Sequence, residues 1–286
     1  MPPSLRVYGV PLSQPFRSVV WALLQKKESF SIGVTTPGVK GNHGTLSATF
    51  REKSGHRFNS IPFLEYIEEI DTYPGSSSNS NHSVVKTTRE SSSQQCIFES
   101  PAILTHLCLS RPGWEDLYAP PGSLAQAHID SYLHWHHSNT RQLAKLVAHW
   151  IRPEIPKPEA DTFEACHSVL ECLDTAWLGN NNNSTEETLY LVNNQYSIAD
   201  ILCYGELSQV YFTHMVDIDS DYPNIQRWMG RMREQPWHDA VHTALTTLGT
   251  LHGPVTPRRL TEAHKAGSAA ITQAMEQNAA ERAAGE

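Results

Sequence analysis

Two serines stand where the sequence predicts the first turn of a helix, a place suited to holding an anion. Ser13 precedes Pro15 and Ser100 precedes Pro101, and proline fits a first helical turn because no N–H is lost there. Free backbone N–H groups and the positive end of the helix dipole converge at such a start and can hold a carboxylate. Glu99 adds a carboxylate that could pair with an amino group, so one small ligand bearing both groups would satisfy this segment. The alternative for each serine is a cap or a turn residue without further function.

A third segment is Ile61-Pro62, at the predicted start of a strand. Proline cannot donate a hydrogen bond to a sheet, so it belongs at the start of a strand or on an edge. An X–Pro bond can also be cis at modest cost, which would turn the backbone of Ile61 outward toward an extended ligand. The simpler interpretation is an edge proline.

The residues that could bind a metal ion lack the spacing of a metal site. His134, His136 and His137, with His128 nearby, do not follow the i, i+4 spacing of helical zinc pairs. We therefore expect these histidines to pack or to lie on the surface, and no metal site is predicted. The cysteines form no Cys-x-x-Cys pair, which indicates neither structural zinc nor a disulfide framework; they are Cys96, Cys108, Cys166, Cys172 and Cys203.

The elements that must position these residues divide the chain into two parts. Up to about residue 111 the sequence predicts a small mixed sheet with helices on its faces. Its strands are expected at residues 5–10, 30–34, 61–67 and 95–98, with helices from Pro15 and over 101–109. After a Pro/Gly-rich linker the apolar spacing is helical at 124–150, 161–178, 198–212 and 224–234. Ser197 and Asp200 form a predicted capping box at the start of the third of these helices.

Three stretches contain few apolar side chains that a core could bury. Residues 71–94 are rich in serine and predict a disordered insertion between two strands. The sequon at Asn81 within it comes without a secretion signal, so glycosylation is not expected. Residues 180–183 are four asparagines, which predict a linker, and residues 251–286 predict a polar tail with little apolar face.

Composition and charge exclude several classes of protein. The 286 residues carry 22 basic and 30 acidic side chains, a net charge of −8, and no basic stripe that would indicate nucleic-acid binding. No run of 18 apolar residues could span a membrane. The first residues lack the pattern of a secretory signal. We therefore expect a soluble protein of a reducing compartment, without nucleic-acid or membrane partners.

Seven short motifs follow one another between about residues 5 and 244, if the serine-rich insertion is left out. They are Ser13-Gln14-Pro15-x-Arg17, Lys40-Gly41-Asn42-His43, Ile61-Pro62, Glu99-Ser100-x-Ala102-Ile103-Leu104, Tyr132-Leu133-x-Trp135-His136, Ser197-x-x-Asp200 and Tyr222-Pro223-Asn224-Ile225-x-x-Trp228. Together they resemble the cytosolic glutathione S-transferases, and the theta class most of all. Each motif is weak alone, but seven in this order are a specific signal.

The resemblance implies a fold and an activity. A thioredoxin-like, glutathione-binding domain (1–111) would be joined by a linker (112–122) to an all-helical domain (123–250) that shapes the electrophile site, followed by the tail. The implied enzyme conjugates glutathione, as co-substrate and without a further cofactor, to a small electrophile. Ser13 would be catalytic and would hydrogen-bond the sulfur, because the thiolate is the nucleophile. A cytoplasmic, homodimeric detoxification enzyme is the family expectation.

The same resemblance implies which residues bind glutathione. His43 matches the residue that contacts its glycine end, and the backbone of Ile61, before a cis Pro62, matches the one that pairs with the cysteinyl main chain. Glu99 and Ser100 match the pair that holds the γ-glutamyl group.

Three further positions bear on the active site. Tyr8 is the alternative to Ser13, but it lies nine residues before Arg17, where theta-like members have a core aromatic residue, so Ser13 is predicted. Arg141 matches an arginine that lines the theta-class active site. Ser60 replaces a lysine common in the family, which puts one carboxylate contact of glutathione in doubt.

Other functions are compatible with the same residues. A glutathione-dependent peroxidase or dehalogenase would use the same site, and the fold also serves non-catalytic binding or scaffold proteins. The joint presence of Ser13, Pro62, Glu99 and Ser100 argues for an active site.

Overall fold

The computed structural model describes residues 4–41, 43–55, 59–67, 69–70, 87–88, 96–179 and 188–285. They form two compact units. The sheet unit comprises residues 1–9 and 29–99, and the helical unit residues 10–28 and 100–286. The first predicted helix therefore belongs to the helical unit, although it lies near the start of the chain. Apart from residues 87–88, the predicted serine-rich insertion at 71–94 with its sequon lies outside the described residues, as does the predicted asparagine linker at 180–183.

The sheet unit contains the four predicted strands. They are β1 (Ser4–Gly9), β2 (Phe30–Val34), β3 (Phe63–Ile67) and β6 (Cys96–Phe98). The order is β2-β1-β3-β6, with β1 and β2 parallel and the other two pairs antiparallel, so the sheet is mixed as expected. A second ladder pairs β4 (Glu69–Ile70) with β5 (Thr87–Thr88), and α2 (Ala48–Lys53) follows β2.

The register of the sheet brings four chain segments to one edge. Tyr8 pairs with both Gly33 and Phe63, and Phe63 pairs with Phe98. The carboxyl ends of β1, β2 and β6 and the start of β3 therefore meet there, because β3 runs antiparallel to its neighbours. The loop after β2 stays at this edge through a bridge between Thr36 and Gly44.

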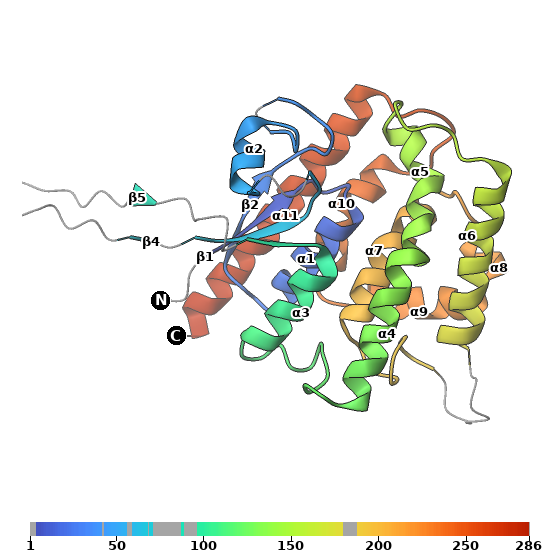
Figure 1. Cartoon of the computed structure of the whole chain (residues 1–286), viewed down its shortest axis with the longest axis horizontal. Helices are drawn as coiled ribbons and strands as arrows, with labels where there is room; N and C mark the ends of the chain where they lie inside the picture. Colours follow the sequence, from blue (N-terminus) through green and yellow to red (C-terminus); the bar gives the residue numbers. More distant parts are fainter. Residues whose placement is uncertain are drawn as a thin grey trace, which may run out of the picture. The chain divides into compact units, whose positions relative to one another are not determined.

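The helical unit is built around α7 (Ile198–Phe212), in which every residue from Ile198 to Val210 is buried. The other helices are α1 (Gln14–Gln25), α3 (Ser100–Ser110), α4 (Leu124–Ser138), α5 (Ala144–Ile151), α6 (Ala160–Cys172), α8 (Ile218–Asp221), α9 (Pro223–Arg233), α10 (His238–Leu248) and α11 (Pro257–Gly285). Helices α1, α3, α4, α5, α9 and α10 all pack against α7 (Figure 1). A helix that is apolar on all sides is typical of such a central position.

Two predicted helices are divided more finely than the apolar spacing indicated. The predicted helix at 124–150 consists of α4, a 3-10 turn (Thr140–Leu143) and α5. The predicted helix at 161–178 is α6, continued by one π turn (Leu173–Trp177). The periodicity changes little across such a turn, so the pattern alone does not mark it.

The predicted capping box at the start of α7 is confirmed. The carboxylate of Asp200 accepts the backbone N–H of Ser197 at 3.0 Å, and the Ser197 hydroxyl accepts the N–H of Ala199 at 3.2 Å. Asp200 also accepts hydrogen bonds from the N–H of Leu191 at 3.0 Å and from the indole of Trp228 at 2.9 Å. One carboxylate thus joins a loop and α9 to the start of the central helix.

Residues 251–286, expected to be a polar tail with little apolar face, contain α11, one face of which is buried. Its buried residues recur every three or four positions and are mostly small: Ala263, Gly267, Ile271, Ala274 and Asn278. This face packs on α10 and α1 (Figure 1). Small residues carry little hydrophobic signal, which is why the sequence pattern did not reveal a packing face.

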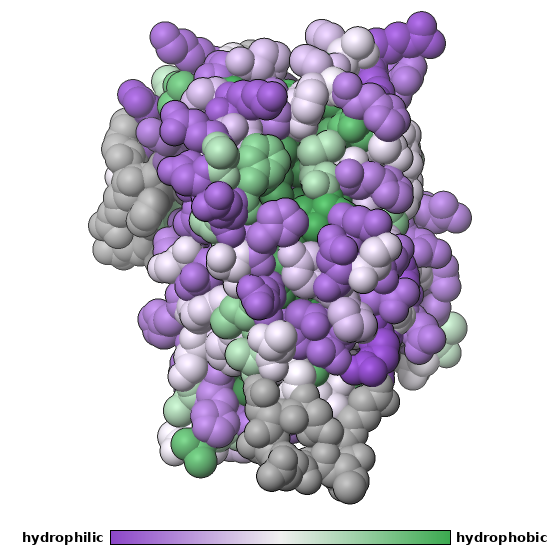
Figure 2. Space-filling model, turned by 90° about the vertical axis from the view of Figure 1, so that its right-hand side faces the viewer, coloured by the Kyte–Doolittle hydropathy of each residue, from purple (hydrophilic) through white to green (hydrophobic). Residues whose placement is uncertain are grey.

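The face of the molecule shown in Figure 2 is largely hydrophilic. Figure 2 presents the face that carries α6 and α8 in Figure 1, and apolar side chains gather in only one area of its upper half. Phe163 on α6 is one of the exposed large apolar residues, at 38%. No helix among the described residues combines the length and the apolarity needed to cross a membrane.

Candidate functional site

Ser13 occupies the N-cap position of α1, with an extended backbone at φ −77° and ψ 121°. Its N–H donates to the carbonyl of Val10 at 2.9 Å, and its carbonyl accepts the N–H of Arg17 at 3.0 Å. The half-buried hydroxyl makes no capping hydrogen bond, nor any other within the described part of the chain. The structure therefore does not support the interpretation of Ser13 as a capping serine, because the hydroxyl is left available beside the free N–H groups of the helix start.

Arg17 fixes the turn that leads to Ser13. Its side chain is buried, and its guanidinium donates to the carbonyl of Leu12 at 3.0 Å and to that of Pro11 at 3.4 Å. The other terminal nitrogen donates to the carbonyl of Gly205 on α7 at 2.8 Å, and both reach the amide of Gln209 at 3.3 Å. Burial lowers the pKa of Arg17 to about 10, which leaves it charged at neutral pH. The fork of a guanidinium suits such simultaneous contacts.

The sheet unit places Pro62 and Glu99 at the edge described above. The Ile61–Pro62 peptide bond is cis, as the resemblance predicted. Because Phe63 pairs with Phe98, the preceding Pro62 and the following Glu99 are neighbours at the end of that ladder. Glu99 is exposed and has a left-handed backbone at φ 65°, which a residue with a side chain adopts at a cost. Strained residues of this kind concentrate at ligand sites.

His43 lies in the exposed loop that returns to the same edge. Its carbonyl accepts the N–H of Thr36 at 2.7 Å, and its side chain is exposed. The sheet unit therefore brings His43, Ile61, Pro62 and Glu99 to loops at one edge of the sheet.

Ser100 and Arg141 belong to the helical unit. Ser100 is the first residue of α3 and is buried. Arg141 lies in the 3-10 turn after α4 and forms an ion pair with Glu206 of α7. The guanidinium side chain is 39% exposed whereas that of Glu206 is 2% exposed, and burial raises the pKa of the Glu206 carboxyl group. A buried acid thus holds the partly exposed side chain of Arg141 in place.

The side chain of Tyr8 is buried in the core of the sheet unit. Its ring stacks on Phe63 with centroids 4.1 Å apart and lies so close to Gly33 that a Cβ there would be 2.3 Å from the ring. Its hydroxyl donates to the carboxylate of Glu65 at 2.7 Å and accepts from Lys53 at 3.4 Å. Burial raises the pKa of Tyr8. A hydroxyl engaged in this way is poorly suited to stabilise the sulfur of a ligand, which favours Ser13.

The histidines of α4 face different environments. His136 is buried, and burial lowers its pKa to about 3. His128, His134 and His137 are exposed, and Nδ1 of His128 lies 2.9 Å from the side-chain oxygen of Asn193. Nowhere in the described ranges do three potential metal ligands come together.

Sequence reasoning missed the two buried acids of this region. Glu206 is the partner of Arg141, and Glu65 is the partner of Tyr8. Each was visible as a single acidic residue within an otherwise apolar segment, a pattern that predicts a buried charge with a specific partner. The partner itself could not be read from the sequence.

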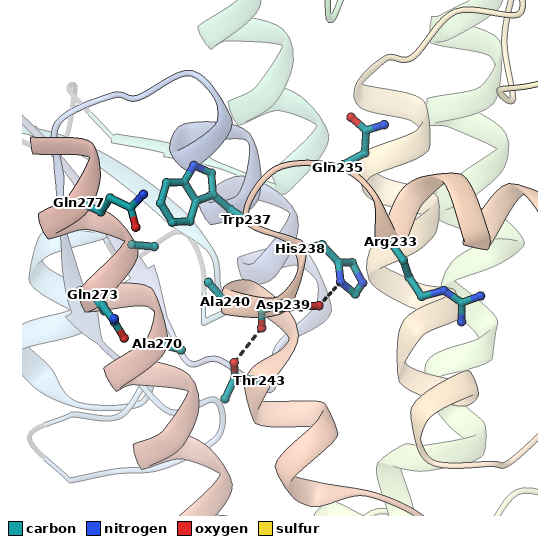
Figure 3. A pocket seen from close by; sticks show the side chains of 11 residues that line it. Arg233, Gln235, Trp237, His238, Asp239, Ala240, Thr243, Ala270, Gln273 and Gln277 are labelled. Atoms are coloured by element: carbon teal, nitrogen blue, oxygen red, sulfur yellow. Dashed lines mark hydrogen bonds and ion pairs between the residues drawn. The ribbon is translucent and has the colours of Figure 1, made fainter. Parts of the chain in front are cut away.

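A cavity of about 420 Å³ lies in the helical unit between the α9–α10 turn and α11. Trp237, at φ 66°, extends toward Gln277 of α11, and Gln273 lies one turn earlier (Figure 3). The hydroxyl of Thr243 donates to the carbonyl of Asp239 at 2.7 Å beside it. The lining contains none of the site residues predicted from the sequence, so this cavity is separate from Ser13.

The fold is shared with solved structures. Human glutathione S-transferase T1-1 in its apo form aligns with a TM-score of 0.63 and 20% identity, over 93% of this chain and 99% of that chain. Human glutathione transferase theta-2 in complex with glutathione also aligns with a TM-score of 0.63 and 20% identity, over 94% of this chain and 98% of that chain. Residues 152–236, which include α6 to α9, match the family model of the glutathione S-transferase C-terminal domain. The chain has the glutathione S-transferase fold. It combines a thioredoxin-like sheet domain with a helical domain, as predicted.

Proteins that are similar to the chain in sequence carry theta or T names. Glutathione S-transferase T3 of Arabidopsis thaliana is 31% identical over 159 residues, which are 51% of this chain and 26% of the relative. Glutathione S-transferase theta-1 of Gallus gallus is 28% identical over 138 residues, which are 48% of this chain and 52% of the relative. The chain thus covers at most about half the length of these two proteins. The predicted resemblance to theta-class glutathione S-transferases is confirmed.

Proposed function

We propose that the protein is a glutathione S-transferase in which Ser13 stabilises the thiolate of glutathione. The observation that carries the proposal is the Ser13 hydroxyl at the start of α1, which has no hydrogen-bond partner among the described residues and lies on a turn held by the buried Arg17. A free thiol with a pKa of about 8.5 is mostly protonated at neutral pH. A hydroxyl donor and a helix N-terminus both favour the anion, and each unit by which the pKa falls corresponds to about 1.4 kcal/mol.

Glutathione would be held by the remaining residues of the predicted site. We assign the γ-glutamyl group to Glu99 and Ser100, the cysteinyl main chain to the backbone of Ile61 before Pro62, and the glycine end to His43. The common edge of the sheet that His43, Pro62 and Glu99 share supports this assignment. Arg141, which the resemblance also places at the active site, would contact glutathione and is held in place by its ion pair with Glu206.

The proposed reaction is nucleophilic attack by the bound thiolate. The sulfur lone pair forms a bond to an electrophilic carbon, and a leaving group departs with its electron pair or, in an addition, the electrons move onto the acceptor. The protein lowers the barrier by orienting the two substrates and by keeping the sulfur ionised. Ser13 donates its hydrogen bond to the anion and is not consumed.

The assembly and the setting are proposed from the same family. We propose a homodimer that acts in the cytoplasm in detoxification, with the glutathione-binding domain at residues 1–111 and the electrophile-binding domain at 123–250. Light scattering of the purified protein tests the dimer.

The deciding experiment is a pH titration of the ultraviolet thiolate absorbance of bound glutathione. We expect the wild type to ionise the thiol well below pH 8.5, and Ser13→Ala to return the pKa toward the free value. Ser123→Ala is the matched control, since Ser123 also caps a helix but spends its hydroxyl on the N–H of Gln126 at 3.1 Å. Glutathione that binds without any shift would identify a binding protein, and no binding at all would leave only a shared fold.

A further inference from the structure

Gly267 lies in the interior of α11, where glycine is an unfavourable choice. A glycine inside a helix is less stabilising than an alanine, because it loses more backbone freedom on folding. The residue is buried, and a Cβ added to it would lie 2.8 Å from Cβ of Pro11 and 2.7 Å from Cβ of Ala244. Neither atom belongs to a flexible side-chain end. The helix can therefore approach the turn at Pro11 and helix α10 only because this position has no side chain.

The Pro11 turn is thereby held from two sides. The guanidinium of Arg17 binds the carbonyls of Pro11 and Leu12, and Gly267 meets the ring of Pro11. The N–H of Ser13 closes the turn on the carbonyl of Val10 at 2.9 Å. The proline ring is rigid, so a displacement at its Cβ is transmitted to the backbone that carries Ser13.

Helix α11 is anchored at the other end of α1 as well. The buried amide of Asn278 donates to the carbonyl of Leu24 at 2.8 Å. Arg282 donates to the carbonyls of Lys27 and Glu28, the latter at 3.5 Å, and Lys27 pairs with Glu281 at 2.7 Å. Because α11 is tied to the end of α1, it cannot simply slide away when its contact with Pro11 becomes too close.

We propose that Gly267 is a positioning residue for Ser13, an inference that rests on the proposed function. Gly267→Ala would force Pro11, Ala244 or both to shift, and the shift at Pro11 would move the Ser13 hydroxyl away from the sulfur. Misplacement of a reacting group by about 1 Å can cost about a hundredfold in rate. We expect kcat to fall by about tenfold to a hundredfold, with a smaller change in KM for glutathione.

The test uses the full chain and the pKa of bound glutathione, a quantity that loss of stability alone does not move. The bound-thiol pKa, read from the ultraviolet absorbance, and the acidic limb of kcat/KM are compared between wild type and Gly267→Ala. In Gly267→Ala we expect the bound-thiol pKa and the pKa of the acidic limb both to rise toward the pKa of free glutathione. Gly230→Ala is the matched control, because an added Cβ on that α9 glycine meets nothing within 4 Å. It should leave both values unchanged.

A double variant separates the two close contacts. Adding Ala244→Gly removes one of the Cβ atoms that crowd position 267 and should recover part of the thermal stability, while the contact with Pro11 persists. A bound-thiol pKa that stays above the wild-type value in the double variant supports the proposal. If Gly267→Ala alone does not fold, the double variant is compared with wild type in its place. A pKa that equals the wild-type value in either variant overturns it. If wild type itself shows no shift, the proposed function fails first and the positioning role with it.

Discussion

The guanidinium of Arg17 on α1 donates a 2.8 Å hydrogen bond to the main-chain carbonyl of Gly205 on α7. Gly205 allows this approach, since a Cβ there would lie 2.4 Å from the hydroxyl oxygen of Ser18. The central helix thus holds the start of α1, and with it the turn that presents Ser13. The proposed thiolate site depends on a contact between residues far apart in the sequence.

Arg17→Lys should destabilise the protein and impair the site together. An ammonium group cannot replace the guanidinium fork, so several buried carbonyl and amide oxygens lose their donor. We expect a loss of about 3–5 kcal/mol in the free energy of unfolding, measured with urea, and a raised bound-thiol pKa. Arg258→Lys is the control, because that side chain is 88% exposed. Equal midpoints for the two variants would contradict the role of Arg17.

Tyr8→Phe should change the stability of the protein, whereas Ser13→Ala should change the pKa of the bound thiol. Removing the Tyr8 hydroxyl leaves the buried Glu65 without its 2.7 Å donor, which should cost about 1–3 kcal/mol of stability. The bound-thiol pKa should stay at its wild-type value. Ser13→Ala removes a hydroxyl with no partner among the described residues, so it should change stability little and the thiol pKa strongly. A thiol pKa that responds to Tyr8→Phe and not to Ser13→Ala would make Tyr8 the catalytic residue.

Asp200→Ala should be more harmful than Ser197→Ala, although both belong to one capping box. Loss of the serine cap costs about 1 kcal/mol. Loss of the carboxylate also leaves the N–H of Leu191 and the indole N–H of Trp228 unpaired, so about 3 kcal/mol or more is expected. Urea unfolding followed by tryptophan fluorescence measures both. Costs of equal size would show that the bonds to Leu191 and Trp228 contribute nothing.

His136 should make the protein sensitive to acid. Its pKa is lowered to about 3 in the folded state, against about 6.5 in an unfolded chain. Between these values the unfolded chain binds more protons, so stability falls by up to about 1.4 kcal/mol per pH unit as the pH drops below 6.5. His136→Gln should remove this part of the slope when unfolding is measured from pH 7 to pH 4.5. His134→Gln is the control, since that side chain is exposed.

Asp200 acts against His136 in the same pH range. Burial raises its pKa to about 6, above the value of about 3.9 for an unfolded aspartate. The folded state therefore binds more protons between these values, and the stabilising contribution of the protonated form is lost as the pH rises through 6. The two effects partly cancel between about pH 4 and 6 in wild type. In His136→Gln the opposing slope from Asp200 should become visible. A pH profile identical to that of wild type would refute the assignment of His136, and a flat profile in the variant would refute that of Asp200.

Much of the local structure followed from the sequence. The strands predicted at residues 30–34 and 95–98 and the helix predicted from Pro15 are found at 30–34, at 96–98 and from Gln14. These elements and the capping box of α7 were predicted from apolar alternation, proline positions and cap residues. These signals are local, because each arises from the conformational preferences of a few neighbouring residues. The family resemblance supplied the cis bond at Pro62 and the choice of Ser13 over Tyr8, which the hydrogen bonding of the two hydroxyls supports.

The tertiary structure decided what these residues contact. The pairing of Arg141 with Glu206 and of Arg17 with Gly205 joins positions far apart in the chain, and no periodic pattern encodes such a pair. The packing face of helix α11 escaped prediction because it is made mostly of small residues, which bury little apolar area each and pack by close approach. Whether a glycine such as Gly267 is a weak point of a helix or a required contact depends on the atoms opposite it, and only the folded chain brings those atoms there.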